Sequence, residues 1–69
     1  MSTGSVIANG KVAEVIFPCS IEQFLVSHGL RPKSVVVELN GEAVAPSEFA
    51  RSALEAGDRL EIVQIVAGG

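Results

Sequence analysis

The chain has 69 residues and a formal net charge of −3, and 48% of its residues are hydrophobic, mainly Val, Ile, Leu and Ala. This length suits one domain over residues 1–69, and a single Cys19 and a single His28 provide neither an internal disulfide nor a metal cluster. The five Lys and Arg residues are scattered, which argues against nucleic-acid binding, and no apolar run is long enough to span a membrane. We expect a soluble cytoplasmic protein with an aliphatic core.

A β-hairpin is predicted at the start of the chain. Residues 6–8 and 11–17 are rich in strand-forming residues, and Asn9-Gly10 lies between them. Asn-Gly tolerates the positive φ angles of a type I′ turn, so the two strands should be antiparallel. Pro18 then ends the second strand.

A helix is predicted next. Ser20 and Gln23 have the spacing of a capping box, and Gly29 is placed to end the helix in a left-handed conformation, with Leu30 as its hydrophobic contact. One helical face then carries Ile21, Phe24, Leu25 and His28.

The second half begins with a β-branched strand over residues 34–39, a second Asn-Gly pair at Asn40-Gly41 and a short edge strand over residues 42–44. The stretch Pro46-Ser47-Glu48-Phe49 resembles a helix start, and one or two helical turns should reach Leu54. The last strand should run from Arg59 to residue 65 or 66. A strand pair, a crossover helix and a late strand parallel to the first predict an α+β β-grasp: a mixed four- to five-stranded sheet, one main helix on one face and a short second helix.

The alternation of side chains predicts an exposed aliphatic patch. If Leu60 and Ile62 point into the core, then Val63 and Ile65 point outward, and Val36 does so on the neighbouring strand. Such a patch would suit a docking partner. Alternation alone also permits a second interpretation, in which these residues only satisfy strand propensity.

Catalytic groups are sparse. A Cys-His nucleophile pair would require the fold to join Cys19 and His28, and more ordinary roles are a half-buried hydrophobe for Cys19 and a C-terminal helix residue for His28. The carboxylates are spread over turns and strand faces, and no phosphate-binding loop is present. We therefore expect no intrinsic enzyme activity and no metal or cofactor held by this chain.

The sequence ends in Ala67-Gly68-Gly69 directly after an apolar strand. Residues 66–69 are predicted to form a flexible tail, in which Ala67 and Gly68 would thread a narrow channel because glycine lacks a Cβ atom. The carboxylate of Gly69 would be ionised and a poor acyl donor, so ATP-dependent adenylation would have to activate it.

Residues 35–69 resemble the ThiS family of sulfur-carrier proteins of thiamine biosynthesis. The matching motifs are VELNGE at positions 37–42, SEF at 47–49, GDRLEI at 57–62 and VAGG at 66–69, and the Asn-Gly hairpin and helix of the first half match more loosely. In one departure, family members often have Pro-Arg before the Ser-Glu-aromatic motif, where this chain has Ala45-Pro46. Any partner contact that needs a cation at that position is therefore in doubt.

The resemblance implies a ubiquitin-like β-grasp and a specific chemistry. An adenylyltransferase related to ubiquitin-activating enzymes would use ATP and magnesium to adenylate Gly69. Sulfur from a cysteine desulfurase would then give a thiocarboxylate for thiazole synthase. Val36, Val63 and Ile65 would be the docking patch.

Several alternatives remain open. The small subunit of molybdopterin synthase uses the same kind of tail, although those chains are generally longer, and another sulfur pathway is possible. A ubiquitin-like modifier would instead join Gly69 to lysines. A noncovalent β-grasp interaction module would not need the terminal glycines at all.

Overall fold

A computed structural model describes residues 1–65. Its elements, in chain order, are β1 (Ser2–Ala8), β2 (Lys11–Phe17), α1 (Ile21–Ser27), β3 (Val35–Leu39), β4 (Glu42–Val44) and β5 (Arg59–Gln64). Single 3-10 turns lie at Pro32–Ser34 and Pro46–Glu48.

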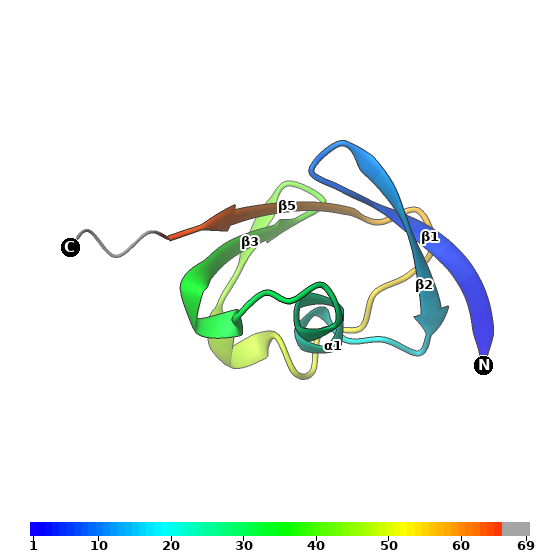
Figure 1. The fold of residues 1–69 in the computed structure, drawn as a ribbon, viewed down its shortest axis with the longest axis horizontal. Coiled ribbons are helices and arrows are strands. Elements are labelled where there is room, and N and C mark those ends of the chain that lie inside the picture. Colours follow the sequence, from blue (N-terminus) through cyan, green and yellow to red (C-terminus); the bar gives the residue numbers. More distant parts are fainter. Residues whose placement is uncertain (66–69) are drawn as a thin grey trace.

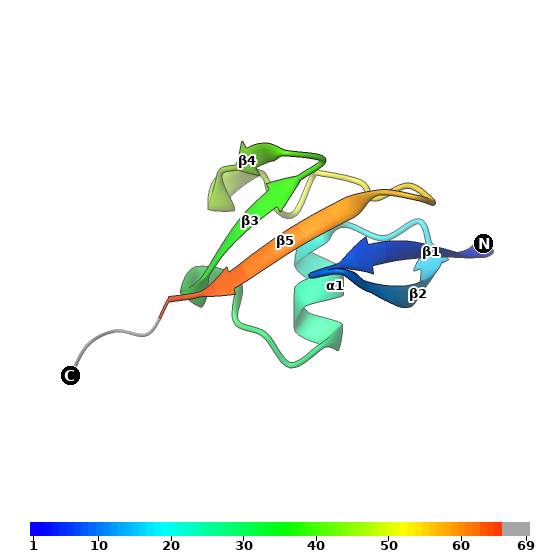
Figure 2. The same ribbon diagram turned by 90° about the horizontal axis from the view of Figure 1, so that it is seen from above.

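The five strands form one mixed sheet in the order β2-β1-β5-β3-β4. The last strand, β5, occupies the centre. It pairs parallel with β1, where Ile7 lies opposite Arg59 and Ala8 opposite Leu60, and antiparallel with β3. Figures 1 and 2 show α1 crossing a single face of the sheet. This arrangement confirms the predicted β-grasp.

Both Asn-Gly turns adopt the predicted backbone conformation. Asn9 and Gly10 have φ angles of 51° and 80°, and Asn40 and Gly41 have φ angles of 52° and 87°. Positive φ at both central residues is the requirement of a type I′ turn, whose twist matches that of the flanking strands. The first hairpin is longer than expected, because β1 begins at Ser2 and pairs with β2 as far as Phe17.

The predicted caps of α1 are both present. The Gln23 amide donates to Ser20 Oγ at 3.0 Å, and the Ser20 amide donates to Gln23 Oε1 at 2.9 Å, which completes the capping box. At the other end Gly29 has φ 73°, and the Leu30 amide donates to the Leu25 carbonyl at 2.9 Å. This is the hydrogen bond of a Schellman motif.

The expected short second helix is present only as a 3-10 turn and does not reach Leu54. Only the 3-10 turn at Pro46–Glu48 forms, and the chain then runs irregularly to β5. The reason lies in α1: its Ile21 amide donates to the Ser52 carbonyl at 2.9 Å, and its Glu22 amide donates to the Phe49 carbonyl at 3.1 Å. These carbonyls satisfy the free amides at the start of α1 instead of continuing a helix of their own.

The hydrophobic core lies between α1 and the sheet. Its buried members are Val6, Val15, Ile21, Phe24, Leu25, Val35, Val37, Phe49, Leu54, Leu60 and Ile62. They are aliphatic except for two Phe, as the composition predicted, and no polar or charged residue within 1–65 is buried. None of the helices in this part of the chain is long and apolar enough to cross a membrane.

Candidate functional site

The candidate site is built around the end of β5, which precedes the C-terminal residues of the sequence. Register pairs join β5 to β3 from Leu60 with Leu39 to Gln64 with Val35. One residue further, the Ile65 amide donates to the Ser34 carbonyl at 2.7 Å. The chain is therefore held up to the last described residue by β3 and by Ser34, which directly precedes it; Figure 2 shows β5 running beside β3.

The opposite edge of β5 is held by a side chain. The parallel ladder with β1 ends at Leu60, and Asn9 then takes its place beside the strand. Asn9 Oδ1 accepts from the Ile62 amide at 2.7 Å, and Asn9 Nδ2 donates to the Ile62 carbonyl at 3.0 Å. A side-chain amide thus bonds to the strand as a backbone peptide group would. Sequence reasoning identified Asn9 only as a turn residue.

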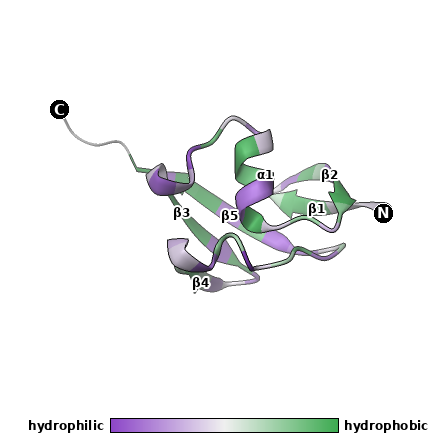
Figure 3. Cartoon of the chain, turned by 90° about the horizontal axis from the view of Figure 1, so that it is seen from below, coloured by the Kyte–Doolittle hydropathy of each residue, from purple (hydrophilic) through white to green (hydrophobic). Residues whose placement is uncertain are grey.

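The predicted outward residues are exposed as expected. Val36, Val63 and Ile65 have relative accessibilities of 48%, 62% and 54%. Val36 and Val63 are direct cross-strand partners, and Ile65 follows two positions after Val63 on the same face. In Figure 3 the end of β5 and the neighbouring β3 are hydrophobic in colour. We call Val36, Val63 and Ile65 the outer patch; its role in docking stays a prediction.

The tail residues of the prediction lie outside the described residues. These are Ala67, Gly68 and Gly69, together with the proposed tail boundary at residue 66.

A cation near the base of the tail was missed. Arg31, from the connector after α1, lines a depression of about 260 Å³ together with Gln64 and Ile65. The sequence presented Arg31 only as part of a connector before Pro32. Its position beside Ile65 depends on where the sheet places β5, which the local sequence does not show.

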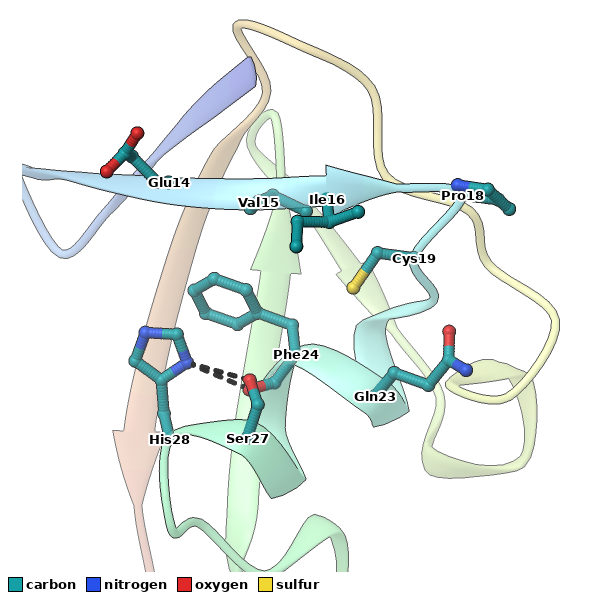
Figure 4. Close-up of a pocket in the computed structure, with 9 residues that line it drawn as sticks. All are labelled: Glu14, Val15, Ile16, Pro18, Cys19, Gln23, Phe24, Ser27 and His28. Carbon is teal, nitrogen blue, oxygen red and sulfur yellow. Dashed lines mark hydrogen bonds between the residues drawn. The ribbon is translucent and has the colours of Figure 1, made fainter. Parts of the chain in front are cut away.

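Cys19 and His28 line the same depression between β2 and α1, which has a volume of about 360 Å³ (Figure 4). Their polar atoms have other partners: Cys19 Sγ contacts the Ser20 carbonyl at 3.4 Å, and His28 Nδ1 lies 3.0 Å from the Phe24 carbonyl. The His28 ring also stacks on the Phe24 ring, with centroids 4.2 Å apart. Burial raises the pKa of the Cys19 thiol, which opposes the thiolate a nucleophile requires.

Metal chemistry has no visible basis in this part of the protein. Within residues 1–65 no three His, Cys, Asp or Glu side chains gather where they could hold an ion. The described residues instead present the end of β5 beside the exposed side chains of the outer patch.

Comparison with known proteins identifies the relatives of this arrangement. The model of the ThiS family matches residues 6–69, which is nearly the whole chain. A thiazole synthase from Paramagnetospirillum magneticum is 35% identical over 63 residues, and these make up 91% of this chain. The chain spans only 19% of the length of that curated relative.

Solved structures give the same result. The crystal structure of a thiamine biosynthesis protein, ThiS, from Geobacter metallireducens superposes with a TM-score of 0.80 at 26% identity, covering 94% of this chain and 99% of that one. A solution structure of a thiamine biosynthesis protein from the same organism gives a TM-score of 0.77, again at 26% identity, covering 94% of this chain and 87% of that one.

Proposed function

The chain belongs to the ThiS family, and from that membership we propose that it is a sulfur carrier whose C-terminal Gly69 is converted to a thiocarboxylate for thiazole formation in thiamine biosynthesis. The family match, which extends to residue 69, is the observation that carries the proposal. The relatives are a thiazole synthase and a thiamine biosynthesis protein, and they favour the thiamine pathway over molybdopterin synthesis.

The proposed chemistry proceeds in three steps. A carboxylate oxygen of Gly69 attacks the α-phosphorus of ATP on an adenylyltransferase that holds magnesium, and pyrophosphate leaves. The terminal sulfur of a cysteine desulfurase persulfide then attacks the carbonyl carbon, and AMP leaves. Reduction of the resulting S–S bond by a thiol gives the thiocarboxylate. The nucleotide and the metal belong to the partner, and the chain acts as a substrate.

Activation is required because the carboxylate is ionised at neutral pH and has no leaving group. Ala67 and Gly68 suit the passage of the tail into the partner's active site. Ala67 has only a methyl side chain and Gly68 has none, so the backbone can enter a narrow channel. The proposal requires a free carboxylate on Gly69.

The outer patch supports docking. An apolar surface next to the reacting segment can be covered by a partner, which gains hydrophobic stabilisation and brings Gly69 to its active site. We infer that the adenylyltransferase and thiazole synthase both use this surface, so that the two would bind in turn. We also propose that the chain and its partners are soluble proteins that act in the cytoplasm.

ATP–pyrophosphate exchange tests the proposed activation. The chain is mixed with the cognate adenylyltransferase, ATP and magnesium, and the exchange of labelled pyrophosphate is measured. Exchange should depend on the chain and should be lost with a semisynthetic chain that carries a carboxamide on Gly69. That control keeps every residue and removes only the ionisable oxygen. Exchange that persists with the carboxamide would place the reaction elsewhere.

A branched Gly-Gly remnant on lysines of other proteins would instead identify a ubiquitin-like modifier. Digests of cells that express the chain would reveal such peptides by mass spectrometry. We expect none under conditions that support sulfur transfer.

A further inference from the structure

One edge of the sheet is a full strand with no neighbour among the described elements. β2 pairs only with β1, through seven register pairs that run from Ser2 with Phe17 to Ala8 with Lys11. β4 ends the sheet on the other side and has only three residues. Figure 2 shows β2 on the side of the sheet away from β3 and β4. A long free edge is a surface on which another extended chain can pair.

The direction of the backbone groups of β2 follows from β1. The Ile7 amide donates to the Asp58 carbonyl at 2.8 Å, on the side of β5, so the odd residues of β1 face β5 and the even residues face β2. The register joins these even residues to the odd residues of β2. The amides and carbonyls of Val12, Glu14 and Ile16 therefore point sideways from β2, in the plane of the sheet and away from β1. No group within residues 1–65 bonds to them there.

The helix leaves this edge accessible. Two depressions, of about 360 Å³ and about 400 Å³, lie between β2 and α1, and Phe24 and His28 line both of them. Together they follow the strand from Lys11 to Ile16. Within residues 1–65 no strand pairs with the outer side of β2, so an incoming strand can lie beside it.

The side chains along the edge form a pattern. Val12 and Ile16 are 74% and 64% exposed, and Glu14 lies between them on the same face of the strand. In Figure 4 the Glu14 carboxylate points away from α1. The single ion pair recorded within residues 1–65 joins Arg51 and Glu48, so Glu14 has no cationic partner in this part of the chain. The exposed side chains along this edge are therefore apolar, acidic and apolar in turn.

This pattern disfavours a second copy of the chain as the occupant. Antiparallel pairing of two β2 strands that matches Val12 with Ile16 places Glu14 opposite the same carboxylate of the second copy. Like charges directly opposite each other in a sheet are destabilising. A shift of two residues relieves this repulsion but sets Glu14 against Val12. A partner with a cation in the central position avoids both defects.

We propose that the edge of β2 binds an extended segment of a partner protein with the pattern apolar-x-Lys/Arg-x-apolar, which adds a sixth strand to the sheet. The central cation faces Glu14, the apolar residues face Val12 and Ile16, and backbone hydrogen bonds form to the outward groups of the same three residues. Because the pattern is symmetrical, it fits a parallel or an antiparallel strand. β1 separates this edge from β5, so the binding is independent of the tail and of the proposed sulfur chemistry.

Peptide titration followed by NMR tests the proposal. The probe is an acetylated and amidated peptide with the core Ile-Thr-Lys-Thr-Val, and its control has Glu in place of Lys. The amide signals of Val12, Glu14 and Ile16 should shift with the lysine peptide. The glutamate peptide should bind roughly three- to tenfold more weakly, since an attractive cross-strand charge pair becomes a repulsive one.

The variant Glu14→Lys supplies the matched reversal, since the side chain is exposed and the change should not disturb folding. It should prefer the glutamate peptide by a similar factor, and Glu14→Gln should lose the preference. The proposal is overturned if neither peptide shifts these signals up to its solubility limit. Equal binding of both peptides, or shifts centred on β4 or β5, would contradict it as well. A wild-type dimer in sedimentation, whose dilution shifts the amide signals of Val12, Glu14 and Ile16, would identify the occupant as a second copy instead.

Discussion

Asn9 and Asn40 combine two tasks in one side chain. Each begins a turn with a positive φ angle, and each also binds the backbone of the central strand β5. Asn9 bonds to Ile62 twice, while Asn40 Oδ1 accepts from the Arg59 amide at 2.9 Å. Aspartate or glycine could satisfy the turn, but only an amide offers both a donor and an acceptor. The two residues pin β5 on both of its edges.

The variants Asn9→Gly and Asn9→Ala separate these tasks. Glycine keeps the turn conformation and removes the two hydrogen bonds to Ile62, so it should lower the free energy of unfolding by about 1–3 kcal/mol. Alanine should cost a further 1 kcal/mol or so, because a Cβ atom disfavours the left-handed conformation. Urea denaturation measures both values. Equal stability of Asn9→Gly and wild type would refute a structural role for the side chain.

The Cys19 thiol provides a pH test. Burial raises its pKa in the folded protein above that of the unfolded chain. A raised pKa stabilises the folded protein fully below the unfolded value, and this contribution is lost as the pH rises through the folded value. Alkaline destabilisation should therefore be weaker in Cys19→Ser. Titration of the thiolate absorbance should give a midpoint above that of a free thiol, and a midpoint at or below it would contradict the assignment.

At the residue scale, the sequence predicted what is local. Asn-Gly indicates a turn because the constraint lies within the dipeptide itself. The partner of Asn9 is 53 positions away, at Ile62, and no local pattern identifies it. Arg31 was missed for the same reason, since its position beside Ile65 arises from the sheet.

At the scale of elements, α1 is a short helix whose first turn is fully bonded. Its first two amides use carbonyls of the segment before β5, and the next two, from Gln23 and Phe24, use Ser20 Oγ and the Ser20 carbonyl. A helix of seven residues is marginal on its own and depends on such bonds and on its buried face. The cap residue should therefore matter more than the propensity of the exposed positions.

Ser20→Ala should lower the free energy of unfolding by about 1 kcal/mol, the usual cost of losing an N-cap. Val26→Ala is the matched control, because Val26 lies in the same helix and is 60% exposed. It should change stability by less than about 0.5 kcal/mol. Thermal or urea denaturation of both variants measures the difference. Similar losses in the two would mean that the capping box contributes no special stability.

The sequence predicted α1 and both hairpins because their signals lie within a few residues. It failed where backbone groups serve distant elements. Pro46 and Glu48 look like a helix start, yet the Phe49 and Ser52 carbonyls bond to α1. It also placed the start of β1 too late, because Ser2 to Ser5 carry no strand pattern and are ordered by their pairing with β2.

On the scale of the whole molecule, the sheet sets the end of β5 beside the outer patch. It places β2 at one edge, separated from β5 by β1 (Figure 1). The order of elements was enough to predict this topology, since a β-grasp leaves few ways to bring a last strand to the centre. Alternation along β5 was enough to predict which side chains face outward.

Val63→Lys tests docking at the outer patch. The side chain is 62% exposed, so stability should change little, while a charge in the contact should raise the KM of the adenylyltransferase for the chain by about tenfold, equivalent to about 1.4 kcal/mol. Val26→Lys makes the same change at a similar exposed fraction on α1 and should leave the KM unaltered. Equal KM values for the two variants would exclude the patch from this interface.

The central claim is that Gly69 carries sulfur. Top-down mass spectrometry of the protein isolated from its native cells tests this claim most directly, because intact mass gives the modification and fragmentation gives its position. We predict a species in which one oxygen is replaced by sulfur, located at Gly69. A tail that stays unmodified in the presence of the active adenylyltransferase, ATP and a sulfur donor would contradict the account.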